Sequence, residues 1–159
     1  HAECMEAAKI LSNGGGQKPL RAFTPADLES AKDKMSDVVY RRAKHVIEEN
    51  ARVVKAKELL LSGDIAGVGK LLNASHESSR RLFENSCEEL DFLVDKVSTM
   101  KGVFGARLSG GGFGGAVMAL TDETFSQADA EKVAELYEAK FGKKPTVFTC
   151  ASGDGAKTV

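Results

Sequence analysis

A run of glycine constrains the fold of this chain more than any other feature. Residues 110–115 read Gly-Gly-Gly-Phe-Gly-Gly and hold five of the sixteen glycines in the 159 residues. Because glycine has no Cβ atom, it adopts left-handed backbone conformations and allows another backbone or a phosphate to approach closely, at a cost of about 0.5–1 kcal/mol per residue relative to alanine inside a regular element. The flanking segments 103–108 and 116–120 are strand-like. The run therefore predicts a functional loop between two strands, with a flexible hairpin tip as the alternative.

Three familiar glycine motifs do not account for this run. Gly110, Gly112 and Gly115 match G-x-G-x-x-G, but a dinucleotide-binding loop leads into a helix, whereas residues 116–120 predict a strand. The chain has no Gly-Lys-Ser/Thr sequence, which excludes a nucleoside-triphosphate P-loop. The protein-kinase pattern matches literally through Val117, yet none of its downstream motifs follows.

Composition excludes several classes of function. Formal net charge is −1 and there is no Trp, so nucleic-acid binding, which favours a basic surface with stacking aromatics, has little support. No apolar run approaches the roughly 18–20 residues of a membrane span. Cys4, Cys87 and Cys150 share no metal-ligand spacing with one another or with the three histidines, so they predict free thiols in a cytoplasmic protein and no metal site. The opening at His1 has no initiator Met or signal peptide and predicts a fragment of a longer protein.

The first two thirds of the chain predict helices. Residues 2–11 have helical spacing, Thr24 followed by Pro25 begins a second helix, and a longer helix runs from about residue 36 to 61. Ser62-Gly63-Asp64 separates it from a helix that ends near residue 83. Ser86 and Glu89 form a predicted capping box for a helix through about residue 100. Short turns between these helices predict adjacent antiparallel packing.

The long helix carries one apolar stripe, which predicts a single buried face. Asn50 falls inside this stripe and is expected either to tie down a neighbouring segment or to lie half-buried at the edge. The stripe consists of Val39, Ala43, Val46, Val53 and Leu60, with Ile47, Val54 and Leu61 beside them.

The last third has a different pattern. The two strands around the glycine run precede an amphipathic helix over 126–141, and alternating residues over 145–150 predict a final strand. Strands that follow a helical half indicate an α+β fold, with a small, mainly antiparallel sheet covered by helices on one face.

The segment 105–115, Gly-Ala-Arg-Leu-Ser-Gly-Gly-Gly-Phe-Gly-Gly, closely resembles the third signature of the galactokinase, homoserine kinase, mevalonate kinase and phosphomevalonate kinase (GHMP kinase) superfamily. Its glycine run is similar to the form found in galactokinases. Four other segments agree with the family in order and spacing, so that the likeness covers essentially the whole chain: residues 41–53, 73–78, 86–91 and 152–156.

This resemblance implies that residues 1–159 are a ferredoxin-like GHMP kinase C-terminal domain. Galactokinases transfer the γ-phosphate of ATP to the 1-hydroxyl of galactose. Their phosphate-binding loop, catalytic Asp, its Arg partner and most sugar contacts belong to an N-terminal half that this sequence lacks. The resemblance therefore implies no catalytic residue here, ATP and Mg²⁺ bound mainly by the other half, and that half as the partner of this domain.

By the same resemblance, the third signature supports the phosphate loop and the reacting end of the sugar. The candidate site residues are Ser109, Gly110, Gly111, Gly112, Phe113, Gly114 and Gly115. Ser109 is expected either to donate a hydrogen bond to the ligand or to cap the strand end, and Phe113 to pack the loop in place rather than to stack on a ligand. Arg107 is expected to meet phosphate or to face solvent.

Structural roles are expected for His45 and His76, and a solvated helix face for Glu48 and Glu49. Two other functions stay open. Some galactokinase-like proteins are non-catalytic sugar and ATP sensors, and related kinases act on N-acetylgalactosamine, arabinose or galacturonate.

Overall fold

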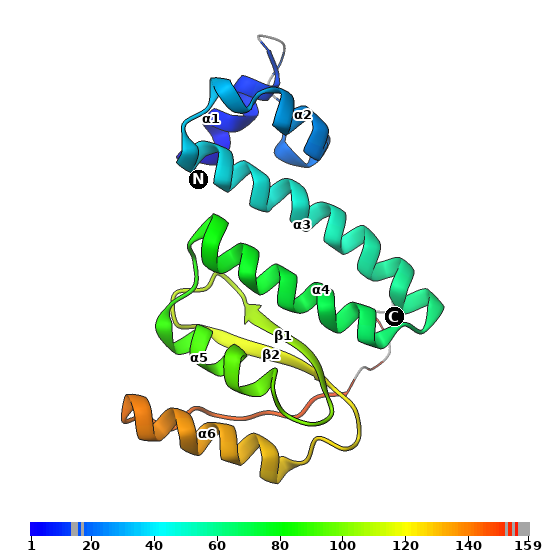
Figure 1. The fold of residues 1–159 in the computed structure, drawn as a ribbon, viewed down its shortest axis with the longest axis vertical. Helices are drawn as coiled ribbons and strands as arrows, with labels where there is room; N and C mark the ends of the chain where they lie inside the picture. The colour runs from blue at the N-terminus through cyan, green and yellow to red at the C-terminus, as the bar shows by residue number, and fades with distance from the viewer. Residues whose placement is uncertain (14–15, 17, 152, 154, 156–159) are drawn as a thin grey trace, which may run out of the picture.

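The computed structural model describes residues 1–13, 16, 18–151, 153 and 155, so the family match over 152–156 lies mostly outside the described residues. Helices and strands follow one another along an elongated molecule, with α1 and α2 at one end and α6 at the other (Figure 1). The elements are α1 (Ala2–Leu11), α2 (Pro25–Ser30), α3 (Asp37–Ser62), α4 (Ile65–Ser78), α5 (Glu88–Val97), β1 (Val103–Ser109), β2 (Ala116–Thr121) and α6 (Gln127–Phe141). Two short 3-10 turns, η1 (Leu20–Ala22) and η2 (Lys32–Lys34), and the π-helical turn η3 (Ser79–Phe83) connect them.

Local signals placed most helix ends correctly. The Thr24 hydroxyl and the Asp27 carboxylate form a reciprocal capping box at α2, and Gly63, with φ 76°, ends α3 in the left-handed conformation. The predicted capping box at Ser86 is wrong. The first residue of α5 is Glu88, and the Ser86 hydroxyl instead donates to Asp91 Oδ1 over 2.6 Å, because a nearby carboxylate offers it a charged acceptor.

The first core lies between α1, α2 and the first half of α3. Its buried side chains are Ala7, Ala8, Leu20, Leu28, Val39, Ala43 and Ile47. The predicted stripe continues along α3 but its burial does not, because Val53 and Leu61 are 68% and 80% exposed. Asn50 is also exposed, and its side chain bonds to no neighbouring segment among the described residues. The first half of α3 has α1 and α2 to cover it, whereas α4 packs against a different face of the helix, the one that carries His45 and Glu49.

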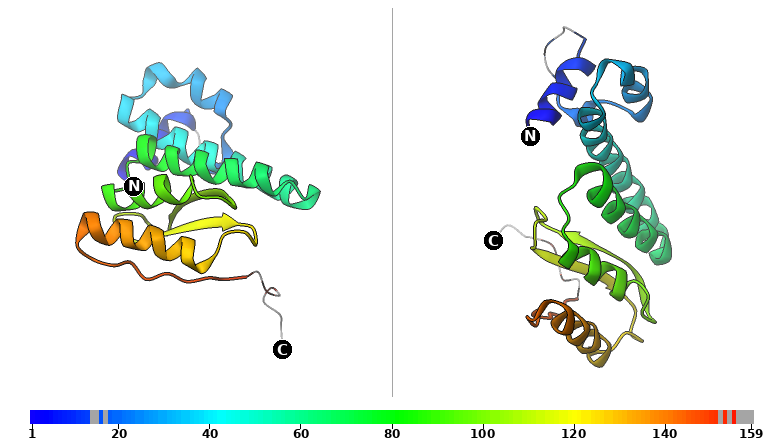
Figure 2. Two further views of the ribbon diagram at one scale, coloured as in Figure 1. Left: turned by 60° about the horizontal axis from the view of Figure 1, so that its bottom comes forward. Right: turned by 60° about the vertical axis from the view of Figure 1, so that its left-hand side comes forward.

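The sheet has two antiparallel strands, with Ala106 opposite Ala119 and Leu108 opposite Val117. The second core lies where α5 covers one face of this sheet. It contains Val94, Val97 and Ala106, with Val103, Val117, Ala119 and Phe125 packed around them. Figure 2 shows α6 beyond α5 at the end of the molecule, and the Phe92 ring contacts the Phe141 ring there at 5.5 Å. The α+β fold with a sheet covered on one face is therefore confirmed.

The predicted strand over 145–150 is wrong. Among the described residues the sheet order is β1-β2 alone, and the segment after α6 runs past the helix without secondary structure. Its alternation does leave Val147 half-buried and Phe148 exposed. Alternation selects a buried face, but a strand also needs a neighbour whose backbone groups it can pair with.

Helix α4 closes the free edge of β1. The backbone N–H of Ala106 donates to Asn73 Oδ1 over 2.8 Å, and that of Leu108 donates to His76 Nδ1 over 3.3 Å. Gly69 and Gly105 allow this approach, because a Cβ atom on Gly105 would lie 2.0 Å from the carbonyl oxygen of Gly69. The helix thus satisfies donors that an exposed edge strand would present to solvent. None of the described helices is long and apolar enough to cross a membrane.

Candidate functional site

The glycine loop, residues 109–115, joins β1 to β2 and lies largely exposed. Gly110, Gly112 and Gly114 have φ angles of 77°, 84° and 95°. Around Gly110 and Gly114 no described atom comes within 4 Å of the place a Cβ would occupy, but a Cβ on Gly112 would lie 1.9 Å from the carbonyl oxygen of Asn85. The close approach of another backbone thus requires glycine at position 112. At positions 110 and 114 glycine is favoured only because the backbone has a positive φ.

Asn85 holds the middle of this loop. Its carbonyl oxygen accepts from the Phe113 N–H over 2.9 Å, and its side-chain Nδ2 donates to the carbonyl oxygen of Gly111 over 3.3 Å. The residue is 9% exposed, and none of the described residues donates to its Oδ1. One residue outside the loop therefore fixes both sides of Gly112.

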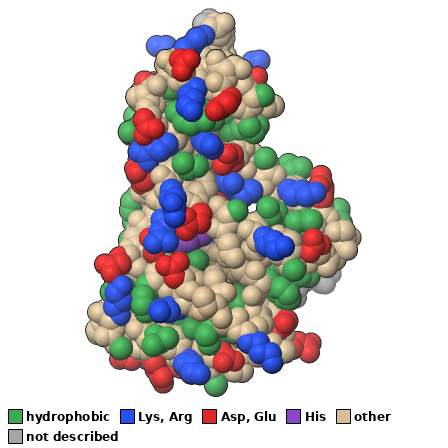
Figure 3. All heavy atoms as spheres, viewed as in Figure 1, with side chains coloured by type: hydrophobic (Ala, Val, Ile, Leu, Met, Phe, Trp, Pro, Cys, Tyr) green, Lys and Arg blue, Asp and Glu red, His purple; other side chains and the backbone are tan. Residues whose placement is uncertain are grey.

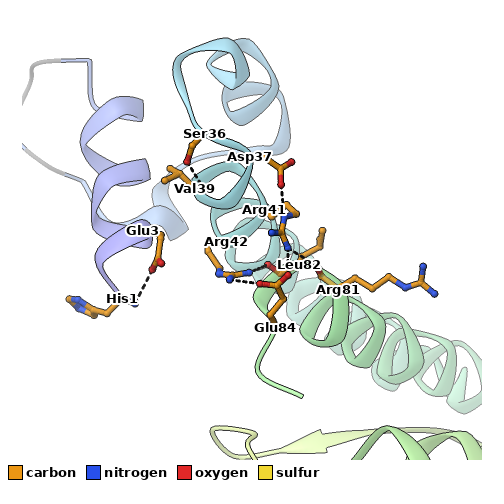
Figure 4. A network of polar contacts seen from close by, with 10 residues as sticks. All are labelled: His1, Glu3, Ser36, Asp37, Val39, Arg41, Arg42, Arg81, Leu82 and Glu84. Atoms are coloured by element: carbon orange, nitrogen blue, oxygen red, sulfur yellow. Dashed lines mark hydrogen bonds and ion pairs between the residues drawn. The ribbon is translucent and has the colours of Figure 1, made fainter. Parts of the chain in front are cut away.

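The residue before Asn85 has an unusual backbone. Glu84 follows the π-helical turn η3 with φ 58° and ψ 38°, a left-handed conformation that costs an L-residue other than glycine roughly 1–2 kcal/mol. Two arginines of α3 hold its carboxylate, Arg41 Nη1 at 2.5 Å and Arg42 Nη2 at 2.6 Å (Figure 4). Hydrogen bonds from Arg42 and Arg41 also lower the pKa of Glu84.

The same arginines satisfy the end of the preceding helical segment. Arg41 Nη1 donates to the carbonyl oxygen of Arg81 over 3.1 Å, and Arg42 Nη1 donates to that of Leu82 over 2.6 Å. The side chains of Arg41 and Arg42 are 23% and 14% exposed. Charge-assisted hydrogen bonds of this kind, partly removed from water, are the stronger ones in proteins.

His76 fixes the end of β1, directly before the loop. Its Nδ1 accepts from the Leu108 N–H, which places the remaining proton on Nε2, 3.2 Å from Asp91 Oδ1. Arg80 Nε lies 2.9 Å from the other oxygen of Asp91. Burial lowers the pKa of His76 despite the opposing charge of Asp91. The neutral imidazole is therefore a structural acceptor, as predicted.

His45 is structural in the same way. Its ring stacks on Phe83 at 4.6 Å, and its Nδ1 lies 2.9 Å from the Ser78 hydroxyl. Burial lowers the pKa of His45. The imidazole thus joins α3 to the end of α4.

Arg107 and Glu49 differ from expectation. Arg107 Nη1 lies 3.4 Å from Glu49 Oε2, and its Nε donates to the carbonyl oxygen of Leu108, so this arginine pairs internally. Glu49 also accepts from the Ser75 hydroxyl over 2.6 Å and from Arg52, and it is half-buried rather than solvated. Two arginines and a hydroxyl compensate the carboxylate there, and the side-chain hydrogen bonds lower its pKa against the effect of burial.

Two loop side chains have no described partner. The Phe113 ring is 77% exposed, so the expectation that it packs the loop is wrong for the described residues, where the backbone N–H of Phe113 supplies the anchor instead. Among the described residues no hydrogen bond to the Ser109 hydroxyl occurs, and strand-end capping by this side chain is therefore not observed.

The site offers backbone amides and one hydroxyl rather than charged catalytic groups. Within the described part of the chain no group of three His, Cys, Asp or Glu side chains could hold a metal ion. Lys and Arg side chains are interspersed with Asp and Glu over the face drawn in Figure 3. Cys4, Cys87 and Cys150 are free, as predicted. Chemically, the loop can supply backbone N–H groups and one hydroxyl that approach a neighbouring anionic group closely, without a side chain between them.

Sequence reasoning missed Glu84 and Asn85 as neighbours of the loop. The sequence does contain an N-S pair before α5, but no spacing rule links Asn85 to a loop 26 residues away. Arg41 and Arg42 lie within a segment that matched the family, yet their partner Glu84 is more than 40 residues later.

Comparison with known proteins gives the family. A family profile described as "GHMP kinases C terminal" matches residues 56–142, more than half of the chain. The chain belongs to the GHMP kinase C-terminal family. The chain is 42% identical over 157 residues to a galactokinase of Thermotoga petrophila, covering 99% of the chain and 43% of the relative. It is 37% identical to a galactokinase of Clostridium acetobutylicum, covering 99% of the chain and 41% of that relative.

A solved structure agrees with this membership. The crystal structure of Lactococcus lactis galactokinase complexed with galactose superposes with a TM-score of 0.84 at 31% identity, covering 90% of the chain and 37% of the other protein. The chain thus spans less than half the length of these curated relatives.

Proposed function

We propose that residues 1–159 form the C-terminal domain of an ATP-dependent sugar-1-kinase, which transfers the γ-phosphate of ATP to the 1-hydroxyl of galactose in the cytoplasm. The observation that carries the proposal is the glycine loop, whose family-like sequence is held at Gly112 against Asn85 and leaves its outer side exposed. Likeness to galactokinases over 99% of the chain supports the choice of substrate.

In this proposal the loop forms one wall of the reaction site. Phosphoryl transfer depends mainly on positioning and on stabilising charge, and glycine amides can approach phosphate oxygens without a side chain between them. The Ser109 hydroxyl, which has no partner among the described residues, donates to an oxygen of the bound substrates. The wall contributes orientation and excludes water, and it supplies no base.

ATP and Mg²⁺ are assigned mainly to an N-terminal half of the enzyme. The described residues offer no carboxylate cluster for the metal, and Arg107 is already paired with Glu49. When bound, ATP supplies the phosphoryl group and Mg²⁺ neutralises its charge. Two exposed apolar side chains, Phe113 in the loop and Met118 in β2, support packing against that half as the partner of this domain.

The test uses the enzyme that contains this chain, with ATP and galactose, and detects galactose 1-phosphate by phosphorus NMR. The expected result is galactose-dependent transfer by the complete enzyme and none by residues 1–159 alone, with a heat-denatured sample as control. Parallel reactions contain N-acetylgalactosamine, arabinose or galacturonate.

Each alternative has its own outcome. Transfer to one of the other sugars but not to galactose would identify a related kinase, and sugar binding without transfer would identify a sensor. Turnover by residues 1–159 alone would overturn the assignment of the chemistry to the other half.

A further inference from the structure

Three printed contacts join the loop to Asn85, which lies outside it. They are the 2.9 Å bond from the Phe113 N–H, the 3.3 Å bond to the carbonyl oxygen of Gly111 and the close approach of Gly112. A segment with five glycines in six residues has little conformational preference of its own. Its position between the paired ends of β1 and β2 therefore depends on the residue that holds its middle.

Asn85 in turn depends on Glu84, which turns the chain out of η3 in a left-handed conformation. Such a conformation persists at a non-glycine residue when the surroundings fix it. The surroundings here are Arg41 and Arg42, which bind both carboxylate oxygens of Glu84 and two carbonyl oxygens within η3 (Figure 4). A continuous set of contacts runs from α3 to the loop.

We propose that Glu84 and Asn85, which we term the support segment, position the glycine loop for phosphoryl transfer, and that Arg41 and Arg42 hold this segment in place. These four are positioning residues, because they touch the loop or one another rather than the substrates. The inference rests on the proposed function for its effect on rate, but not for its effect on the loop.

The experiment compares Asn85→Ala and Glu84→Gly with the unmodified complete enzyme. Asn85→Ala removes the side-chain bond to Gly111. Glu84→Gly removes the carboxylate that the arginines bind, while glycine adopts the left-handed conformation freely, so relief of the backbone strain offsets part of the lost ion pairing and this variant should still fold. Asp37→Asn is the matched control, because Asp37 is the other carboxylate bound to Arg41, at 2.8 Å, and does not touch the support segment.

Two quantities are measured: amide hydrogen exchange across residues 109–115, and kcat and KM for galactose and ATP. We expect faster loop exchange in both variants and a loss of about 10-fold in kcat, with KM changed much less, because a misplaced wall affects the reacting geometry more than ground-state binding. Asp37→Asn should match the unmodified enzyme in both quantities.

Unchanged loop exchange in both variants would overturn the proposal, and so would a fall in kcat without faster exchange. If Asn85→Ala does not fold, loop exchange and kcat of Glu84→Gly alone test the proposal. If the unmodified enzyme transfers no phosphate to galactose, the proposed function fails, while the exchange measurement still decides whether the support segment fixes the loop.

Discussion

Two contacts between the β1–β2 unit and earlier parts of the chain require glycine, and they differ in their surroundings. At the crossing of α4 and β1, Gly69 and Gly105 are both buried, and Cβ atoms there would lie 2.2 and 2.0 Å from backbone atoms of the other element. At the loop, a Cβ on Gly112 would lie 1.9 Å from the backbone of Asn85, but the loop itself is largely exposed.

An added Cβ atom would thus be nearly equally close to a backbone atom at both contacts, but the two contacts differ in how easily the structure can relax around it. A close-packed crossing can relieve a collision only by separating a helix from a strand, whereas an exposed loop can move outwards with little loss of packing. The crossing should therefore control stability, and the loop contact should control the position of the proposed reaction site.

The largest effect is expected at the crossing. Gly105→Ala places a methyl group on the carbonyl oxygen of Gly69 and should lower the free energy of unfolding by about 3 kcal/mol, towards the upper end for overpacked cores. Urea denaturation measures the loss. Gly111→Ala serves as control, because Gly111 has no described atom within 4 Å of its Cβ position and no positive φ. Equal stability of the two variants would mean that the crossing can relax.

A smaller effect on stability and a large one on rate are expected at the loop. Gly112→Ala should push the loop away from Asn85 by about an ångström, and misplacement on that scale costs on the order of 100-fold in rate. Gly114→Ala is the matched control, since Gly114 shares the positive φ but lies in open space. Steady-state kinetics and thermal unfolding are measured on the same preparations of the complete enzyme.

The comparison fails in either of two ways. Similar losses of kcat in Gly112→Ala and Gly114→Ala would assign the effect to backbone conformation rather than to the contact with Asn85. A fall in Tm for Gly112→Ala as large as that for Gly105→Ala would show that the loop contact is part of the stabilising core.

The parts of the fold that could be predicted from sequence are those set by residues close to one another in the chain. The cap at Thr24, the stop at Gly63 and the strands around the glycine run each depend on neighbours within a few residues, and all appear as expected. Burial along α3 did not follow from its pattern, because apolar spacing gives a face and does not say whether another element covers it. Val53 is exposed for this reason, and the segment 145–150 remains unpaired for a similar one.

The glycine loop itself was identified from the sequence, but the reason for each glycine was not. Gly112 differs from Gly114 only through Asn85, which lies more than 20 residues earlier and makes its contact through a backbone oxygen that every residue possesses. Because the contact uses a backbone oxygen, the side chain of residue 85 does not reveal it in the sequence. The structural role of His76 was more accessible, since this histidine lies in a segment, 73–78, that resembles a helix of the family.

His76 lies between the two glycine contacts and gives the smallest predicted effect. It accepts from Leu108, in the stretch of chain that joins Gly105 to Gly112. Asp91, Arg80, Glu77 and Asp95 are the charged groups around it, and burial dominates them in lowering its pKa. The unfolded chain therefore binds a proton more readily than the folded one, and stability is full above the unfolded pKa near 6.5 and falls as pH drops through that value.

The expected slope is at most about 1.4 kcal/mol per pH unit for one histidine. His45 contributes in the same direction, because burial lowers its pKa too. Carboxylates with lowered pKa, such as Glu49, act at lower pH, since their stabilisation is lost only below their unfolded values near 4.5. Urea denaturation from pH 7.5 to 5.5 thus isolates the histidines. His76→Asn, whose Oδ1 can take the place of the accepting Nδ1, should retain only the slope due to His45, and an unchanged slope would show that the pKa of His76 does not carry the pH dependence.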